Sequence, residues 1–266
     1  MVVSYVMPFY IFYTTATNSS LTLLNKAPLL VIIGVAVPLF GFIIAPPLMR
    51  ALNISVEQKS AFHFCVMYGN TAFLGIPISG FLFGSEGAFY AVMYNFGVML
   101  VIFSIGIWIL SSGSSNSIKS LLENPMMWSM IIGIVFAVLG IHMPQWIDQP
   151  LATLSNLTLP IALLVAGAQI GSIRFEKNGY TPYLIAVTLS RLIVIPGLLI
   201  GLFALLNWHN PDHKVMILES AMPVGISSTI FAKNYGADSN FTAMATLWTT
   251  VLSLITLPLI AWLFLG

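Results

Sequence analysis

The stretch Met67-Tyr-Gly-Asn-Thr-Ala-Phe-Leu-Gly-Ile-Pro-Ile-Ser-Gly-Phe-Leu-Phe-Gly84 lies inside an apolar segment, yet four of its residues argue against a continuous helix. These are Gly69, Gly75, Pro77 and Gly80. Glycine adds backbone freedom, and the ring of Pro77 removes a hydrogen-bond donor and clashes with the preceding turn. The stretch therefore predicts an interrupted helix with unpaired backbone groups at membrane depth, where only protein or a water-filled cavity can surround them.

The composition places the whole chain in a membrane. Of its 266 residues, 58% are hydrophobic and only 6% are charged, whereas soluble domains carry roughly 25% charged residues. A formal net charge of +1 supplies no basic field for nucleic acid. The single cysteine, Cys65, excludes a disulfide scaffold. We therefore expect a polytopic membrane protein that contacts the lipid bilayer and has no nucleic-acid partner.

Nine apolar segments can be interpreted as membrane spans, if each crossing takes roughly 20 residues. They cover residues 2–17, 27–49, 61–82, 87–110, 125–143, 151–171, 181–206, 215–235 and 241–265. The longest connection, Ser111 to Glu123, is rich in serine and typical of a flexible linker. It divides one membrane transport domain into a first half, 1–110, a linker, 111–123, and a second half, 124–266.

The two halves resemble each other at a constant offset of 152 positions. The matching pairs are Pro8 and Pro160, Gly84 and Gly236, Glu86 and Asp238, Phe89 and Phe241, Ala91 and Ala243, and Leu100 and Leu252. Shifting the second half back by this offset places its opening segment, 125–143, before Met1. An odd number of spans in each repeat turns the second upside down relative to the first, which is the plan of secondary transporters. We expect an all-α fold of two inverted five-helix repeats with two crossing broken helices, the first repeat lacking its first helix by truncation or by nature.

Lysine and arginine in alternating connections predict the orientation, because they gather on the cytoplasmic side of a membrane. One side carries Arg50, Lys59, Lys119, Arg174, Lys177 and Lys233, and the other carries Lys26 and Lys214 with Glu86, Asp148 and Asp212. The first side is expected to be cytoplasmic. Met1 then lies inside, and Gly266 outside, a bacterial-type cytoplasmic membrane.

The partner of the opening stretch is Glu219 to Gly236, which also has proline, glycine and small polar residues at mid-span. Two interrupted helices at matching places indicate a binding site, because freed N–H groups favour an anion and freed carbonyls favour a cation. The candidate substrate-binding residues are Asn70, Thr71, Gly75, Pro77, Pro223, Ser227 and Ser228. The alternative is that the prolines and glycines only kink these helices for packing, with each hydroxyl bonded to its own backbone.

Glu219 is the most informative single residue, since a carboxylate about 12 Å into a span costs on the order of 3 kcal/mol or more unless it is paired or protonated. One interpretation is a proton or sodium site coupled to transport. The other is a structural ion pair with Arg191, which is equally deep in its own segment and would then lock or gate the protein. Glu219 and Arg191 are the candidate ion-coupling residues. Sodium at Glu219 is the candidate metal, and no other cofactor is expected.

Two motifs, matching in order and spacing over nearly the whole chain, resemble the auxin efflux carrier family, including its bacterial malate or malonate permeases. The first is Gly69-Asn-Thr-Ala-Phe-Leu-Gly-Ile-Pro77 with Gly84 and Tyr90. The second is Ala221-Met-Pro223 with Phe231-Ala-Lys-Asn-Tyr-Gly236 and Leu257-Pro258.

The resemblance implies ten helices in two inverted repeats, a scaffold part that also forms a homodimer, and a transport part whose fourth and ninth helices cross at proline. Here those prolines would be Pro77 and Pro223. It also implies that Asn70 contacts a carboxylate substrate. A likeness of fold to the bile acid sodium symporters makes Glu219 a similar candidate for binding sodium.

Enzyme signatures are absent from the sequence: it has no zinc-protease helix motif, phosphate loop, nucleophile elbow or metal-spaced Cys/His cluster. We therefore expect no enzymatic activity, but a permease that carries a small organic anion by alternating access, coupled to a proton or sodium. Two alternatives stay open. One is a sodium-coupled symporter of larger amphipathic acids, and the other is a membrane subunit or sensor that does not transport.

Overall fold

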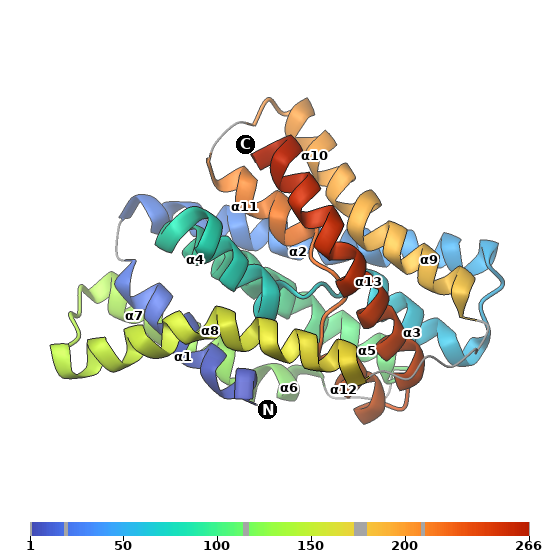
Figure 1. Ribbon diagram of the computed structural model, residues 1–266, viewed down its shortest axis with the longest axis horizontal. Helices are drawn as coiled ribbons and strands as arrows, with labels where there is room; N and C mark the ends of the chain where they lie inside the picture. Colours follow the sequence, from blue (N-terminus) through green and yellow to red (C-terminus); the bar gives the residue numbers. More distant parts are fainter. Residues whose placement is uncertain (1, 19–20, 114–116, 173–179, 209–210, 266) are drawn as a thin grey trace.

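A computed structural model describes residues 2–18, 21–113, 117–172, 180–208 and 211–265, and its described part is mostly helical, without strands. This confirms the predicted all-helical class (Figure 1). The first half of the chain forms α1 (Val2–Thr17), α2 (Leu21–Ala51), α3 (Val56–Met67), α4 (Ile76–Val101), α5 (Ile107–Leu110) and α6 (Ser117–Leu122). The second half forms α7 (Pro125–Leu139), α8 (Gln145–Ser172), α9 (Thr181–Leu189), α10 (Ile195–Leu205), α11 (Pro211–Ser220), α12 (Ser228–Asn234) and α13 (Ser239–Ile260).

Several of these helices continue into one another through π-helical turns, which carry one extra residue per turn. The turns cover Thr71–Gly75 before α4, Ile102–Gly106 between α4 and α5, Ser190–Val194 between α9 and α10, and Ala261–Leu265 after α13. In the described part of the chain, four continuous helices are long and apolar enough to cross a membrane: Leu23–Ala51, Thr71–Leu110, Thr181–Leu205 and Ser239–Phe264. The chain is therefore an integral membrane protein.

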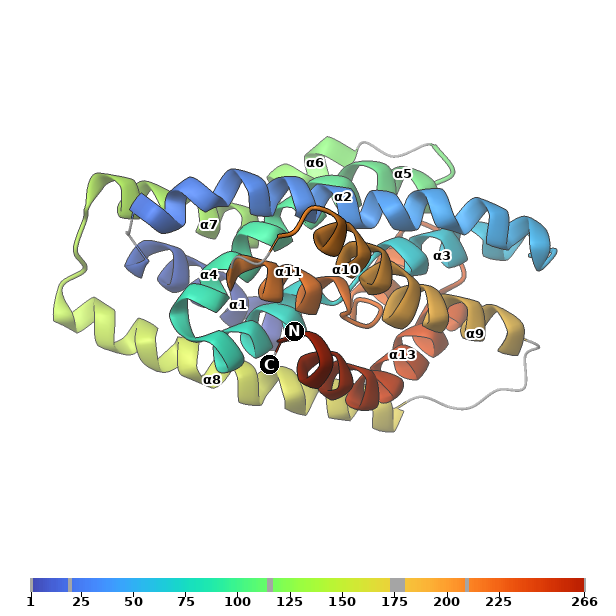
Figure 2. The same cartoon turned by 90° about the horizontal axis from the view of Figure 1, so that it is seen from above.

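The helices pack in two groups. In one group, α1 lies against α7 and α8. In the other, α2 packs along α4 and α3, α11 packs on α4 and α10, and α13 packs on α3, α9 and α12. Figure 2 shows α2 along one edge of the molecule and α8 along the opposite edge. Fewer contacts join α1 and α8 to α4, so the boundary between the groups runs beside α4.

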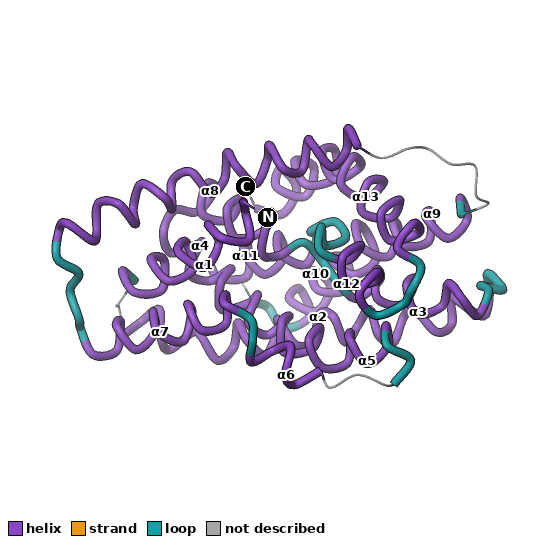
Figure 3. The backbone as a smooth tube through the Cα atoms, turned by 90° about the horizontal axis from the view of Figure 1, so that it is seen from below, coloured by secondary structure: helices purple, strands orange, loops and turns teal. Residues whose placement is uncertain are grey.

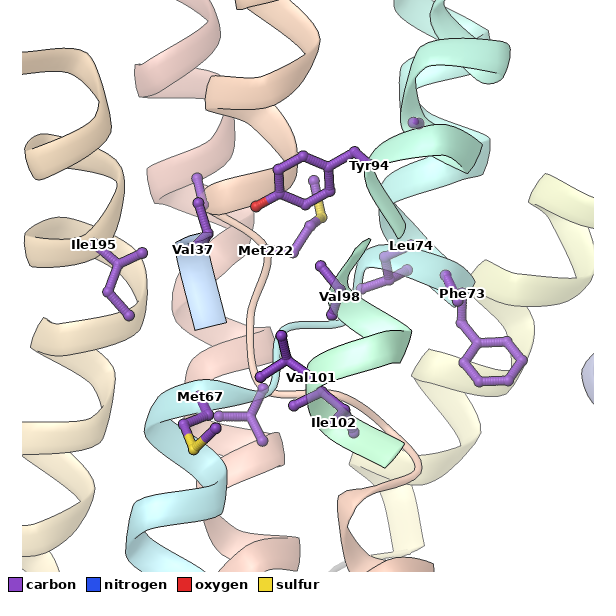
Figure 4. Close-up of a cluster of buried hydrophobic side chains, with 14 of the residues drawn as sticks. Val37, Met67, Phe73, Leu74, Tyr94, Val98, Val101, Ile102, Ile195 and Met222 are labelled. Carbon is purple, nitrogen blue, oxygen red and sulfur yellow. The ribbon is translucent and has the colours of Figure 1, made fainter. Parts of the chain in front are cut away.

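Close backbone packing holds α2 against α4. A Cβ atom added at Gly34 would collide with the carbonyl oxygen of Tyr94, and one added at Gly97 would collide with the carbonyl oxygen of Val31. Buried side chains from several helices then fill the centre of this group, among them Val37, Met67 and Val98 (Figure 4). The result is a tightly packed body around the two chain interruptions.

The interruption lies within the predicted stretch, around Gly69, but not at Pro77, where the family resemblance placed the crossing. The helical pattern stops at Tyr68–Asn70 and resumes at Thr71, whereas Pro77 is the second residue of α4. Pro77 lies inside the continuous helix that begins at Thr71, two residues after its π-helical turn, so the missing N–H of proline coincides with an irregularity of that helix. A second interruption within α4 is at Gly84, whose φ of 70° is accessible mainly to glycine. The predicted boundary between the segments 61–82 and 87–110 lies at this kink.

The linker is less irregular than its serine content predicts, because α6 occupies Ser117–Leu122 and Lys119 forms an ion pair with Glu123 across 3.8 Å. Residues 114–116 of this linker lie outside the described residues. So do Met1, Gly266, Arg174 and Lys177, on which part of the predicted orientation rests.

Candidate functional site

The two chain interruptions meet in the interior and form hydrogen bonds to each other. Gly69 and Val224 form an isolated antiparallel pair. The N–H of Asn70 donates to the carbonyl of Pro223 at 2.7 Å, and the N–H of Gly225 donates to the carbonyl of Tyr68 at 3.0 Å. The segments that join α3 to α4 and α11 to α12 therefore cross among the helices (Figure 3). Pro223 lies at this crossover, and Pro77 does not.

Asn70 is buried at the crossover with an unused side chain. Its backbone is fully engaged, since its carbonyl accepts from the N–H groups of Leu74 and Gly75. Its side chain is 1% exposed, and neither the carboxamide nitrogen nor the oxygen has a hydrogen-bond partner among the described residues. Leaving a buried polar group unsatisfied costs about 1–3 kcal/mol. An amide with a free donor and a free acceptor in this position is suited to bind a ligand.

Thr71 has a partner of its own. Its hydroxyl donates to Oδ1 of Asn95 at 2.7 Å, and Nδ2 of Asn95 contacts the sulfur of Met99 at 3.4 Å. Asn95 is 3% exposed on the returning part of α4. Sequence reasoning missed this residue, although an amide in the middle of an apolar segment is itself a signal of a polar partner. The pair fixes the start of the π-helical turn Thr71–Gly75 against α4.

Glu219 is fully buried next to the end of α11 and faces the start of α4. Its Oε1 accepts a hydrogen bond from the Ser79 hydroxyl at 2.8 Å, and its Oε2 has no hydrogen-bond partner among the described residues. The carboxyl group lies directly on Gly75, where an added Cβ would collide with it. The structure thus brings together Glu219 and Gly75, one expected in the ion site and the other in the substrate site. Ser79, which the sequence reasoning did not select, belongs to the same cluster through its hydrogen bond to Glu219.

Arg191 and Glu219 do not form an ion pair, so the alternative of a structural ion pair between them is wrong. The ion pairs among the described residues join Lys26 to Asp212 at 3.5 Å and Lys119 to Glu123. Instead, Nη2 of Arg191 donates to the carbonyl of Met222 at 2.8 Å and approaches the carbonyl of Ser220 at 3.4 Å. Ser220 is the last residue of α11 and Met222 follows it, at the end of the helix where carbonyl groups lack intrahelical partners. Arg191 therefore supports the second interruption from the π-helical turn between α9 and α10.

Replacing Arg191 with methionine is expected to destabilise the protein. Met222 and Ser220 would lose the donor for their buried carbonyls, at ~1–3 kcal/mol for each unsatisfied group, and the melting temperature in detergent should fall by roughly 5 °C. The matched control is Arg50→Met, because Arg50 is exposed at the end of α2. Equal melting temperatures for the two variants would contradict a supporting role for Arg191.

The two serines of the second stretch differ in their surroundings. Ser228 is fully buried and shares a 3.0 Å hydrogen bond with the hydroxyl of Thr246 on α13. Ser227 is half-buried and lines a cavity. The N–H of Val224 donates to the hydroxyl of Thr249 at 3.0 Å, and no sequence feature had pointed to Thr249. Ser228 therefore helps to hold α12 on α13, whereas Ser227 is accessible from the cavity that it lines.

Two cavities flank the crossover along α4. The smaller one, of about 170 Å³, is lined by Tyr68, Ala72, Phe73, Asn95, Met99, Ile102, Phe103, Asn124, Pro125, Met126, Ser227 and Phe231. The larger one, of about 340 Å³, is lined by Tyr10, Tyr13, Thr14, Thr17, Asn18, Pro77, Gly80, Phe81, Gly84, Ser85, Ala88, Ser155 and Asn156. Ala72 and Phe73, shortly after Asn70, line the smaller cavity. Pro77 and Gly80, which flank Ser79 in sequence, line the larger one.

Comparison with known proteins gives a consistent picture. A family model described as "Membrane transport protein" matches residues 1–120 and 109–261. An uncharacterised transporter of Methanocaldococcus jannaschii is 27% identical over 274 residues, covering 100% of this chain and 88% of the relative. One of Methanothermobacter thermautotrophicus is 28% identical over 194 residues, covering 71% of this chain and 63% of the relative.

The plant relatives match over a shorter stretch. Auxin efflux carrier component 8 of Arabidopsis thaliana is 29% identical over 121 residues, which are 44% of this chain and 33% of that protein. The chain thus covers less than two thirds of some of these relatives. The family model, in contrast, matches nearly all of the chain. The protein belongs to the auxin efflux carrier family of membrane transport proteins, and it is a transporter rather than an enzyme.

Proposed function

We propose that the protein is a secondary transporter that moves a small organic carboxylate by alternating access, coupled to a proton or a sodium ion. The observation that carries the proposal is the buried crossover, where the Asn70 carboxamide has no partner among the described residues. Interrupted helices that meet inside a membrane protein are typical of transporter binding sites. The crossover is also reached by residues from both halves of the chain, as a site between two repeats requires.

Inverted repeats are supported by matching backbone features. Gly84 and Gly236, 152 positions apart, have similar positive φ angles of 70° and 76°. Each is followed two residues later by an acid, Glu86 or Asp238. Asp238 caps α13 by accepting from the N–H of Phe241 at 2.9 Å. Two copies of one five-helix unit would each have a glycine kink before a long helical segment. On that basis we propose nine spans in this chain.

An anion at the crossover would be held by the Asn70 amide and by the start of the helix at Thr71. The N-terminus of a helix carries unpaired N–H groups and a partial positive charge, which favour a carboxylate. Ser227 and Tyr68 line the adjoining cavity and add hydroxyl groups within it. Gly75 and Pro223 shape the two chain segments, whereas Pro77 would act only by starting α4.

The coupling ion would bind at Glu219. In a buried site, a carboxyl group is stable when it carries a proton or faces a cation, and Oε2 of Glu219 is available for either. Ser79 supplies a second oxygen at this position. Ion binding and substrate binding would communicate through Gly75, which contacts the Glu219 carboxyl group and donates its N–H to the carbonyl of Asn70 at 3.0 Å.

The moving part would be the group that contains the crossover, and the support would be α1, α7 and α8. A homodimer through this supporting group, in a cytoplasmic membrane with Met1 inside and Gly266 outside, completes the proposal. The short linker, with Lys119 at its surface, would lie on the cytoplasmic side.

The test begins with a thermal-shift screen of dicarboxylates, monocarboxylates and indole acids, with and without sodium. An acid that raises the melting temperature is then followed as a radiolabelled solute into proteoliposomes. A sodium requirement for a large amphipathic acid would favour the symporter alternative. If no acid stabilises the protein and none enters the vesicles, the proposed function is wrong.

Replacing Asn70 with alanine is expected to weaken substrate binding by roughly 10-fold or more, because a hydrogen bond to a charged group contributes ~1.5–3 kcal/mol. The melting temperature without substrate should hold or rise, since an unsatisfied buried amide is removed. Isothermal titration or a substrate-dependent thermal shift measures the change. Asn234→Ala, at an exposed position at the end of α12, is the control. Unchanged affinity in Asn70→Ala would remove Asn70 from the site.

A further inference from the structure

The larger cavity lies at the boundary between the two helix groups. Residues of α1 and α8 form one wall, and residues of α4 between Pro77 and Ala88 form the other. None of the described lining residues is charged, but eight carry a hydroxyl or a carboxamide: Tyr10, Tyr13, Thr14, Thr17, Asn18, Ser85, Ser155 and Asn156. Neutral oxygen ligands are suited to water and to small hard cations. An apolar solute would find few partners here.

Glu219 lies behind the α4 wall of this cavity. Pro77 and Gly80 line the cavity, and Ser79 between them is fully buried and donates to the Glu219 carboxyl group. An ideal Cβ on Gly80 would lie 2.7 Å from the hydroxyl of Tyr10, so α1 approaches the wall closely at this point. Ser79 therefore links the α4 wall of the cavity to the Glu219 carboxyl group.

The smaller cavity lies on the other side of the crossover. It is lined by Ala72 and Phe73 after Asn70, and by Asn124 and Pro125 at the start of α7. The larger cavity is lined instead by Thr17 and Asn18 at the end of α1 and by Gly84 and Ser85 at the kink of α4. Neither Ser79 nor Gly80 is among the described residues that line the smaller cavity.

We propose that the larger cavity is the access route of the coupling cation to Glu219, through Ser79, and that it opens on the opposite membrane face from the cavity beside Asn70. The cation is a proton or a sodium ion, since the neutral oxygen lining suits both. This inference rests on the proposed coupling role of Glu219. It adds a separate route for the ion, so that cation and substrate reach the crossover from different sides.

Single cysteine substitutions test from which membrane face each cavity is accessible. In a Cys65→Ala background, Ser155→Cys places a thiol in the larger cavity, Ser227→Cys places one in the smaller cavity, and Ser190→Cys is a buried control that lines neither. A membrane-impermeant methanethiosulfonate reagent is applied to either face of the vesicles. Ser155→Cys should react roughly tenfold faster from one face, Ser227→Cys roughly tenfold faster from the other, and Ser190→Cys from neither. Reaction of both cavity thiols from the same face would overturn the proposal.

Flux after labelling tests the ion route itself. Each labelled variant is compared with its own unlabelled sample over a pH series, with and without sodium. After labelling, Ser155→Cys should need a roughly tenfold higher proton or sodium concentration for half-maximal flux. The substrate concentration for half-maximal flux should change little. A dependence on protons alone or on sodium alone identifies the ion. Full retention of cation dependence after labelling would overturn the route.

A Glu219→Gln variant in the same background separates the two proposals. If it abolishes cation dependence while labelled Ser155→Cys retains it, Glu219 couples transport but the larger cavity is not its route. If Glu219→Gln itself retains cation dependence, the coupling role fails, and the proposed route fails with it.

Discussion

Replacing Glu219 with glutamine is expected to abolish the dependence of substrate flux on pH and on sodium, and with it any uptake against a gradient. Glutamine keeps the shape of the side chain and an oxygen for the Ser79 hydroxyl. It has no ionisable group, so it cannot release a proton or neutralise a cation. Downhill exchange of substrate should continue, since Asn70 and the crossover backbone are unchanged. Proteoliposome flux over a pH series, with and without sodium, measures the effect.

The stability of Glu219→Gln gives an independent readout. Burying an ionised carboxylate costs on the order of 3 kcal/mol, so the neutral amide should leave the melting temperature unchanged or raise it. Glu57→Gln, at an exposed position in the first turn of α3, is the matched control and should behave as the parent protein. Flux of Glu219→Gln with the parent's pH and sodium dependence would exclude the coupling role.

Replacing Gly75 with alanine is expected to reduce transport roughly tenfold or more, although it adds only one methyl group. The new Cβ would occupy the space of the Glu219 carboxyl group. Inserting a methyl group into a packed interior costs ~1–3 kcal/mol, and here the strain would fall on the hydrogen bond between Glu219 and Ser79 and on the turn after Asn70. Substrate flux and the cation concentration for half-maximal flux should both change.

Gly197→Ala is the control, since an added Cβ at Gly197 meets no atom within 4 Å. Alanine in an exposed helix is slightly more favourable than glycine, so this variant should keep or gain stability. In the double variant Gly75→Ala with Glu219→Ala, the collision is absent, and the melting temperature should recover relative to Gly75→Ala alone. Normal flux in Gly75→Ala would contradict the close contact between Gly75 and the Glu219 carboxyl group.

The sequence predicted the two interrupted helices because glycine and proline punctuate both apolar stretches at matching places. It located the second interruption at Pro223, where the structure has it. Of the four residues that marked the first stretch, Gly69 lies at the interruption, Tyr68–Asn70, whereas Pro77, the crossing point implied by the resemblance, does not. Proline commonly breaks a helix interior, but Pro77 lies within the continuous helix after a π-helical turn, an irregularity that composition alone does not predict.

Side-chain partners were harder to predict. Arg191 and Glu219 lie at similar depths, which suggested a pair, but depth does not say which way a side chain faces around its helix. Arg191 bonds to carbonyls that the second interruption frees, and these carbonyls cannot be recognised until the end of α11 is known. Asn95, Ser79 and Thr249 were not selected as site residues, because their hydrogen-bond partners depend on how the helices pack. The role of Asn70 in substrate binding stays a prediction, and its unused carboxamide is the structural reason to test it.

The reciprocal hydrogen bonds at the crossover have a consequence for synthesis of the chain. The carbonyl of Tyr68 and the N–H of Asn70 find their partners in Gly225 and Pro223, more than 150 residues later. Until that part emerges from the ribosome and inserts, the first interruption has two unpaired backbone groups at a depth where lipid offers no hydrogen-bond partner. The newly made first half must therefore stay hydrated or guarded by other proteins, and the site is completed only when α11 and α12 have been added.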